Sequence, residues 1–244
     1  MSAILIFVLF AAAAVLACLS VTVFNAIPAG WLCDYGEKPG EELLGKRVFL
    51  FPHGAVIALI YLFAFFTLFW QFGITSYFYI GCAAAVVLTL IGLADWKYRI
   101  IPDQFVLLLF LAAVILFICD RASGSLFFRD WYSPVLGAFS GAVLMLLMNL
   151  LGKALFRKDS LGTGDLKLFA AAGAFTGFPP VFLLFFLTIF CALFFILLLS
   201  AARRMSKDRY FPFGPCICAA LLLYLSFHRQ MEAFARWYVS LLIL

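Results

Sequence analysis

Long apolar segments separated by short polar breaks run along almost the whole chain. A helix needs about 20 apolar residues to cross the hydrocarbon core of a bilayer, and segments near this length recur through the sequence. The pattern predicts an all-α, polytopic membrane helix bundle of about eight transmembrane helices, near residues 3–24, 51–72, 76–94, 104–119, 133–156, 166–177, 180–201 and 214–227. Segment 229–244 mixes apolar and basic residues, which is typical of an interfacial helix.

The sixth segment, 166–177, is short for a span. We expect it to be buried by neighbouring helices or to meet a locally thinned or watery region. It begins directly after Asp165, where access to water would be useful.

Composition agrees with the pattern, because 67% of the 244 residues are hydrophobic and only 12% are charged. Soluble domains are about half apolar and about a quarter charged, and no stretch is long and polar enough for a separate soluble domain. The basic residues are scattered, so the net charge of +5 predicts contact with anionic lipid and no nucleic-acid binding. We divide the chain into 1–50, a first membrane helix with a short loop, and 51–244, a membrane-embedded core.

The Lys and Arg residues are distributed unevenly between the two sets of loops. One set holds 13 of the 17, in the breaks 38–47, 97–99, 153–158, 167 and 203–209, whereas the other holds Arg121 and Arg129, with Arg229 and Arg236 in the tail. Basic loops stay in the cytoplasm. With eight spans, both termini would lie outside, and the two motifs described next would face the cytoplasm.

Two polar motifs each place a carboxylate at the end of an apolar segment, where an ionised side chain is costly unless it has a partner or a function. The first is residues 95–103, DWKYRIIPD, and the second is residues 162–168, GTGDLKL. Peptide hydrolysis by paired aspartates needs two carboxyl groups close enough to share a proton, because one activates water while the protonated one polarises the carbonyl. Asp95 and Asp165 are therefore the candidate catalytic pair of a membrane aspartyl protease.

The residues around these two carboxylates have both functional and structural interpretations. Gly162 and Gly164 permit close approach of another chain and suit an extended substrate, or they form a loop entering a helix whose first turn holds Asp165. Asp103 follows Ile-Pro and suits a cap or first-turn position. Lys97, Arg99 and Lys167 are anchors of the basic side, and Lys167 is also a candidate to position substrate.

Other motifs predict packing without specific chemistry. Residues 137–141 and 173–177 are both G-x-x-x-G, a spacing that lets membrane helices approach closely. The seven cysteines form no C-x-x-C pair, so we expect no zinc site. His53 and His228 are isolated, and we expect neither a metal nor a cofactor. The segment 211–215, FPFGP, is interpreted as a rigid turn.

Together the motifs resemble those of the prepilin peptidase family, membrane aspartyl proteases of the Gly-x-Gly-Asp type. The matching residues are Asp95 with the basic stretch and Ile-Pro, the GxGDxKL motif at 162–168, and PFGP at 212–215, in the family's order over roughly residues 76–227. The resemblance implies that Asp95 and Asp165 are catalytic. It also implies that the substrates are type IV prepilins or pseudopilins, cut after a short basic leader at the cytoplasmic face of the inner (plasma) membrane.

The resemblance weakens near the N-terminus. Bifunctional members carry two C-x-x-C pairs after the first helix and N-methylate the new terminus, whereas residues 25–47 here hold one cysteine, Cys33. We therefore expect cleavage without methylation. The acids Asp34, Glu37, Glu41 and Glu42 either attract the basic leader or form a solvated loop.

Two alternatives remain open at this point. One is a protease similar to presenilin or signal peptide peptidase, although those place their first Asp after Tyr and here Ala94 precedes Asp95. The other is a non-enzymatic transporter with intramembrane aspartates.

Overall fold

The computed structural model describes residues 3–33, 45, 47–124, 126–128, 130–156, 162–201 and 211–243. Within these ranges the chain is helical and contains no strand. The acids of the loop after the first helix (Asp34, Glu37, Glu41 and Glu42) lie outside the described residues, as do many of the basic loop residues. The α-helices are α1 (Ala3–Ala26), α2 (Ala55–Phe72), α3 (Ser76–Tyr98), α4 (Asp103–Ser123), α5 (Ser133–Phe156), α6 (Thr163–Thr176), α7 (Val181–Ala201), α8 (Gly214–Ser226) and α9 (His228–Ile243).

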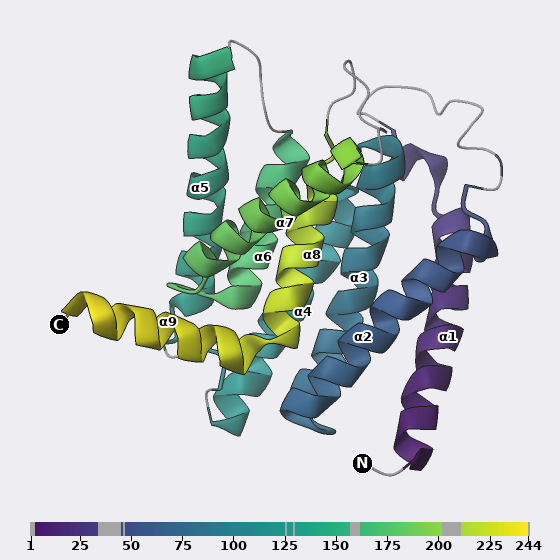
Figure 1. Ribbon diagram of the computed structural model, residues 1–244, viewed down its shortest axis with the longest axis horizontal. Coiled ribbons are helices and arrows are strands. Elements are labelled where there is room, and N and C mark those ends of the chain that lie inside the picture. The colour runs from purple at the N-terminus through teal and green to yellow at the C-terminus, as the bar shows by residue number, and fades with distance from the viewer. Residues whose placement is uncertain are drawn as a thin grey trace.

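Helices α1 to α8 alternate in direction (Figure 1). The end of α3 and the starts of α4, α6 and α8 therefore meet at one end of the bundle, which we call the Asp95 end. The end of α4 and the start of α3 lie at the opposite end, which we call the Asp120 end. Chain direction alone thus collects both predicted motifs at one end of the molecule.

The prediction of an all-helical membrane bundle is confirmed. Six described helices are long and apolar enough to cross a membrane, namely α1, α2 with its preceding turn, α3, α4, α5 and α7. The other two predicted spans also form helices, but α6 has 14 residues and α8 has 13. The number of eight complete spans therefore stays a prediction.

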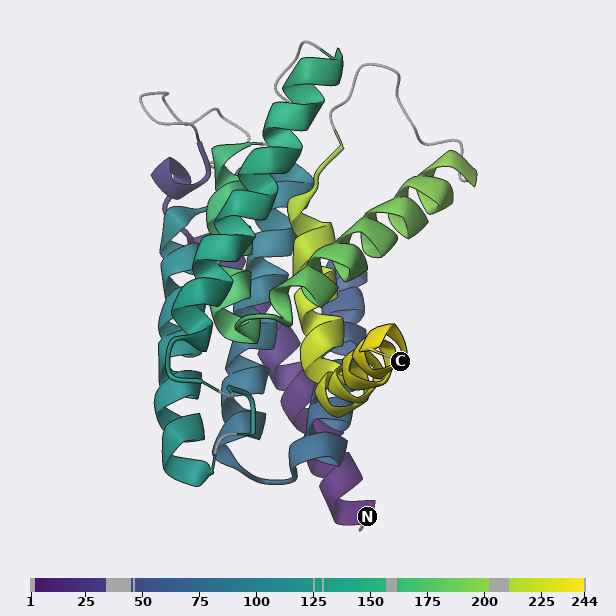
Figure 2. The same cartoon turned by 90° about the vertical axis from the view of Figure 1, so that its left-hand side faces the viewer.

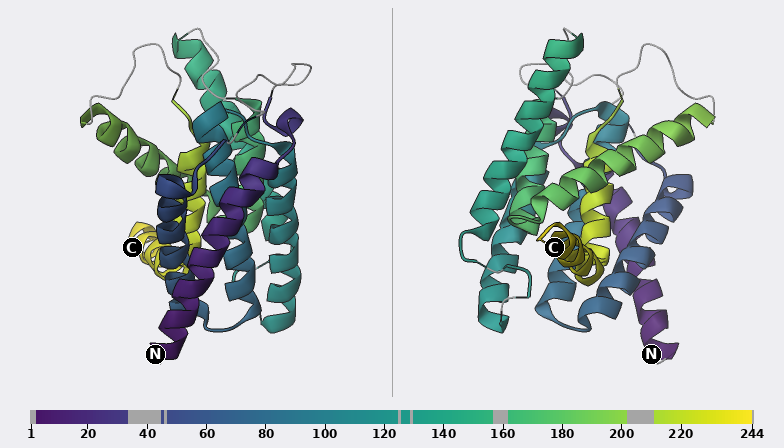
Figure 3. Two further views of the ribbon diagram at one scale, coloured as in Figure 1. Left: turned by 90° about the vertical axis from the view of Figure 1, so that its right-hand side faces the viewer. Right: turned by 60° about the vertical axis from the view of Figure 1, so that its left-hand side comes forward.

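The short helix α6 is buried by its neighbours, as its length predicts. Eight of its 14 residues are buried, and it contacts α4, α5, α7 and α8. Helix α7 slants away from the bundle beside it (Figure 2). On the other side of the molecule, α1 packs mainly on α2 (Figure 3).

The two G-x-x-x-G motifs face each other between α5 and α6. A Cβ added to Gly137 would collide with the carbonyl oxygen of Gly173, and a Cβ on Gly173 would collide with that of Gly137. One turn further along, a Cβ on Gly141 would lie 2.9 Å from the carbonyl oxygen of Phe169. The two backbones touch directly, so α5 sets the height and rotation of α6.

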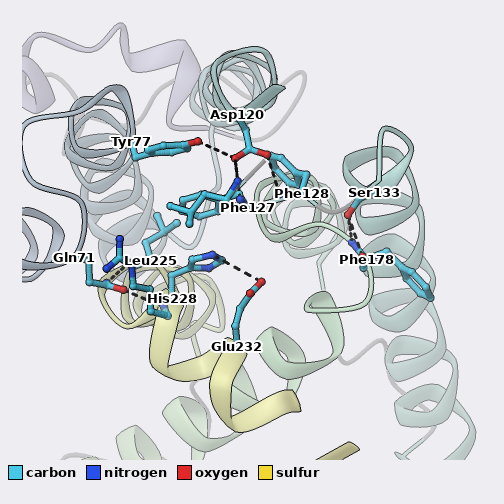
Figure 4. Close-up of polar contacts among 12 residues, drawn as sticks. Gln71, Tyr77, Asp120, Phe127, Phe128, Ser133, Phe178, Leu225, His228 and Glu232 are labelled. Atoms are coloured by element: carbon cyan, nitrogen blue, oxygen red, sulfur yellow. Dashed lines mark hydrogen bonds and ion pairs between the residues drawn. The ribbon is translucent and has the colours of Figure 1, made fainter. Parts of the chain in front are cut away.

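A cluster of polar contacts holds the Asp120 end together (Figure 4). Asp120 Oδ1 accepts hydrogen bonds from Tyr77 Oη at 3.0 Å, Leu126 N at 2.7 Å and Phe127 N at 2.8 Å. Its Oδ2 accepts one from Phe128 N at 3.0 Å. One carboxylate therefore fixes the loop after α4 and ties it to α3.

Helix α9 turns away from α8 at this end and runs across the bundle (Figures 1 and 3). Its first residue, His228, is buried and stacks on Phe127 with ring centroids 3.9 Å apart. The side chain of Gln71 donates to Leu225 O at 3.0 Å and accepts from Arg229 N at 3.1 Å, which joins α2 to the α8–α9 turn. The helix predicted for the tail is present, and its placement at a membrane interface stays a prediction.

Candidate active site

Asp95 lies in the last turn of α3, and its side chain is buried with a residual exposure of 6%. The helix ends one turn later because Arg99 adopts the left-handed conformation, with φ 57°, and donates its backbone N–H to Asp95 O at 2.9 Å. Asp95 Oδ2 accepts the backbone N–H of Gly214, the first residue of α8, at 2.9 Å. A carboxylate at the end of one helix therefore contacts the beginning of another.

Asp165 lies in the first turn of α6. Its Oδ2 accepts the backbone N–H of Gly162, the N-cap residue, at 3.2 Å, which is the half of a capping box that a glycine permits. Its Oδ1 is buried and has no hydrogen-bond partner among the described residues. One oxygen of Asp165 thus caps the start of α6, while the other has no hydrogen-bond donor among the described residues.

The two motifs meet through a close contact and an ion pair. A Cβ added to Gly164 would lie only 3.1 Å from Ile101 Cβ, so the start of α6 packs tightly against the α3–α4 connection. Lys167 Nζ lies 2.9 Å from Asp103 Oδ2, with side chains 47% and 38% exposed. These contacts bring Asp165 to the side of Asp95.

Both carboxyl groups line one cavity of about 350 Å³. Its described lining residues are Gly30, Trp31, Cys33, Asp95, Arg99, Ile100, Ile101, Pro102, Asp103, Gln104, Gly162, Gly164 and Asp165. Asp165 lies at the start of α6, outside the six membrane-length helices. Burial, and to a lesser extent the charge of Asp95, raise its pKa to about 6, against the opposing effect of the hydrogen bond from Gly162.

The chain after α1 forms one wall of the cavity, and side chains hold this segment in place. Asn25 accepts the backbone N–H groups of Arg47 at 2.8 Å and Val48 at 2.9 Å and donates to Val48 O at 2.8 Å. The buried Arg47 guanidinium donates to Ile27 O at 2.5 Å, at the end of α1. The region assigned to the first helix and its loop therefore contributes directly to the cavity.

The structure brings four of the five predicted site residues to the cavity: Asp95, Asp165, Gly162 and Gly164. Lys167 is not among the described lining residues and contacts Asp103 instead. Asp103 occupies the first turn of α4, as expected, and also makes this ion pair, which the sequence did not predict.

The sequence patterns do not mark two parts of the site. Gly214, which contacts Asp95, is predicted only as part of a rigid turn, although its position in the PFGP match is a usable signal. Trp31 and Cys33 line the wall after α1, and no pattern in the sequence marked them. Within the described part of the chain, no three or more His, Cys, Asp or Glu side chains are grouped so that they could hold a metal ion.

The sequence is similar to known membrane peptidases. The pattern of the type IV leader peptidase family matches residues 82–197, which include Asp95 and Asp165. A protein of Neisseria gonorrhoeae named prepilin leader peptidase/N-methyltransferase is 30% identical over 174 residues, covering 70% of this chain and 56% of that protein.

Two further relatives bear the same printed name. The protein of Aeromonas salmonicida (strain A449) is 27% identical over 167 residues, covering 67% of this chain and 54% of its own length. The protein of Bacillus subtilis (strain 168) is 26% identical over 155 residues, covering 63% and 57%. The chain therefore spans little more than half the length of the relatives it matches. No solved structure matches it at a significant level.

Proposed function

Because this chain belongs to the type IV leader peptidase family, we propose that it is a membrane aspartyl endopeptidase that removes the leader of type IV prepilins or pseudopilins. The observation that carries the proposal is that Asp95 and Asp165, from motifs 70 positions apart in the sequence, line one cavity. Two carboxyl groups that share a proton can activate water and polarise a carbonyl in the same step.

The cavity is suited to a peptide substrate. It lies at the end of the bundle where the short helices α6 and α8 begin. In this proposal Gly162 and Gly164 line the path of an extended peptide. Because neither residue has a side chain, the peptide backbone can approach closely there. Lys167 acts at the rim, where its pair with Asp103 joins α4 to α6.

Cleavage takes place at the cytoplasmic face of the inner membrane in this proposal. The uneven Lys and Arg distribution supports that orientation, because basic loops stay in the cytoplasm. Thr163, an exposed residue at the start of α6, offers a direct test. In a cysteine-free background, Thr163→Cys should resist a membrane-impermeant thiol reagent in intact cells and react after the cells are opened. Ready labelling in intact cells would reverse the orientation.

We propose further that the enzyme cuts without N-methylating its product. Residues 25–47 hold one cysteine and no C-x-x-C pair, and a methyl-donor site needs a concave pocket with several convergent polar groups. Mass spectrometry of the product made by this enzyme alone tests the point. An unmodified N-terminus is expected, and a terminus heavier by one methyl group refutes this part of the proposal.

The central test is co-expression with a candidate prepilin, followed by N-terminal sequencing of the product. We expect a new N-terminus directly after the basic leader, and full-length precursor when the enzyme carries Asp95→Asn. If a panel of prepilins and pseudopilins stays uncut by well-expressed enzyme, the substrate class is wrong. Equal cutting with and without the enzyme would mean that a host peptidase is responsible.

A further inference from the structure

The backbone amide of Gly214 has no other role in the helix that it begins. As the first residue of α8, it has no carbonyl four residues earlier in that helix to receive its N–H. Pro215, next in the chain, has no N–H, while Cys216 and Ile217 donate to Phe213 O at 3.0 and 3.2 Å. The Gly214 amide instead donates to Asp95 Oδ2, and this bond is buried.

Only glycine leaves room for the Asp95 carboxyl group at this position. A Cβ built on Gly214 would lie 2.7 Å from Asp95 Oδ2, 2.9 Å from Cγ and 3.1 Å from Cβ. These distances involve most of the Asp95 side chain, which is short and has little freedom to move aside. A methyl group there must therefore push the carboxyl group away from the amide.

The two carboxyl groups differ in how the protein satisfies them. The amide of a first-turn residue favours charge on Asp95, because the N-terminus of a helix carries a partial positive charge. Burial acts against charge on Asp95, whereas the Gly214 amide and the positive charge of Arg99 both favour it. In contrast, Asp165 Oδ1 is buried and has no donor among the described residues. An ionised oxygen in that position is costly, whereas a protonated carboxyl group is not.

Other ionisable groups near the pair come from every surrounding segment. They are Cys33 after α1, Arg99 after α3, Asp103 with its partner Lys167 on α4 and α6, Cys191 on α7, and Cys216 and Cys218 on α8. Among these, Asp103 and Lys167 are of opposite charge and 2.9 Å apart, so their effects on the pair largely cancel. The charge of Arg99 acts in the same sense as the Gly214 amide.

We infer that the pair is asymmetric: Gly214 is a positioning residue that holds Asp95 as the ionised base, and Asp165 carries the shared proton as the acid. The inference rests on the proposed peptidase function. Asp95 takes a proton from water as the water oxygen bonds to the scissile carbonyl carbon, and Asp165 gives its proton to the carbonyl oxygen. When the C–N bond breaks, the leaving nitrogen takes the proton from Asp95, and a hydroxyl proton of the intermediate returns to Asp165.

Gly214→Ala tests the positioning role, and Gly92→Ala is its matched control. Gly92 lies one turn before Asp95 on the same α3–α8 contact, but a Cβ there would meet its nearest neighbours at 3.8 Å, an ordinary packing distance. We expect Gly214→Ala to lower kcat at least about tenfold with KM changed less than about twofold. The low-pH limb of the pH–rate profile of this variant should move to higher pH by about one unit, because Asp95 loses a hydrogen bond to its charged form. Gly92→Ala should leave all three quantities unchanged.

Two outcomes of that experiment overturn the positioning role. One is a Gly214→Ala enzyme with a normal rate and pH profile. The other is a slower enzyme whose acid limb does not move, since loss of packing alone lowers the rate without changing the proton affinity of Asp95.

The proton assignment can be measured even if Gly214→Ala fails to accumulate. Infrared difference spectra between low and neutral pH show the carbonyl stretch of a protonated carboxyl group. Asp165→Asn should abolish a band that titrates near pH 6, whereas Asp95→Asn should keep the band and lower its midpoint, because the charge of Asp95 raises the pKa of Asp165. The reverse pattern overturns the assignment.

These results separate the inference from the proposed function. If Asp95→Asn and Asp165→Asn cut normally, the peptidase assignment of the pair fails. If both are inactive while Gly214→Ala behaves as wild type, the pair is catalytic and the positioning role of Gly214 fails.

Discussion

Asp120 and Asp165 lie at opposite ends of the bundle and differ in the number of hydrogen bonds that they accept. Asp120 is fully buried, with 0% exposure, and accepts four hydrogen bonds shared between both of its oxygens. Asp165 accepts one, and its Oδ1 has no partner among the described residues. Both aspartates sit at the end of an apolar helix, and burial alone does not distinguish a structural carboxylate from a reactive one.

The difference lies in how many donors each carboxyl group has. Tyr77 and three successive backbone amides donate hydrogen bonds to Asp120, and these bonds hold the loop after α4 in place (Figure 4). At the Asp95 end the donors are sparse, and a cavity of about 350 Å³ opens beside the carboxyl groups. A carboxyl group that the fold leaves partly unsatisfied remains able to bind a proton, water or substrate.

The largest expected effect on cleavage is at the Asp95 end, where the carboxyl groups accept few hydrogen bonds. Asp95→Asn and Asp165→Asn should each lower the rate of precursor cleavage by about 10²–10⁴-fold, the usual contribution of a general acid or base, while the protein accumulates in the membrane. The amide replaces the carboxyl group with little change in shape, so Asn can still accept from Gly214 or Gly162. Cleavage by purified enzyme measures the loss, and a rate near that of wild type from either variant would dissociate that aspartate from catalysis.

The same substitution at the Asp120 end should lower the stability of the protein and leave its rate of cleavage unchanged. Asp120→Asn places an amide NH₂ group against a backbone N–H donor, so it should cost about 1–3 kcal/mol of stability. The rate per folded molecule should remain unchanged. Thermal unfolding in detergent, measured with cleavage by the surviving fraction, distinguishes the two effects. A stable but inactive Asp120→Asn protein would break the comparison.

The pH dependence should show the unsatisfied state of Asp165. Since its pKa is raised to about 6 by burial and by Asp95, kcat/KM should fall as the pH rises above about 6, approaching tenfold per unit once Asp165 has lost its proton. Folding should respond in the same window: the folded protein binds this proton more tightly than the unfolded chain, so the contribution to stability is lost as the pH rises from 3.8 to about 6. A rate that stays flat up to pH 8 would contradict the prediction.

The smallest effect is expected at the rim of the cavity. Asp103 and Lys167 form an exposed pair, and such pairs contribute about 0.2–1 kcal/mol. Asp103→Asn should therefore change cleavage by less than about fivefold. Lys167→Met should have a similarly small effect if the lysine only joins α4 to α6, and a larger rise in KM if it also contacts substrate. The double variant distinguishes these cases, because a purely structural pair loses its energy only once.

Much of the fold could be predicted because membrane helices are set by local hydrophobic length. The 12-residue apolar segment 166–177 predicts the short α6, and the two G-x-x-x-G spacings predict close helix packing, although they do not predict that α5 and α6 pair through them. Asp95 and Asp165 were found because each stands beside a distinctive motif. Asp120 has no such motif, since its partners are Tyr77 and backbone amides, and a backbone donor leaves no trace in the residue type.

The contact between Gly214 and Asp95 could not be predicted from the sequence either, because it too uses a backbone donor. It joins residues 119 positions apart, and the functional group is an N–H that almost every amino acid possesses. What the sequence records is only the absence of a side chain. The pairing of Lys167 with Asp103 was likewise hidden, because it depends on how α4 and α6 are placed side by side and on no pattern within either motif.

The lengths of α6 and α8 have a mechanical consequence. With 14 and 13 residues, they rise about 21 and 20 Å, whereas the hydrocarbon layer of a typical bilayer is about 30 Å thick. Eight of the 14 residues of α6 and nine of the 13 residues of α8 are buried by neighbouring helices, so protein and not lipid surrounds most of these two short helices. The first turns that carry Asp165 and Gly214 are therefore positioned by helix packing, which shields the alignment of the carboxyl pair from changes in bilayer thickness.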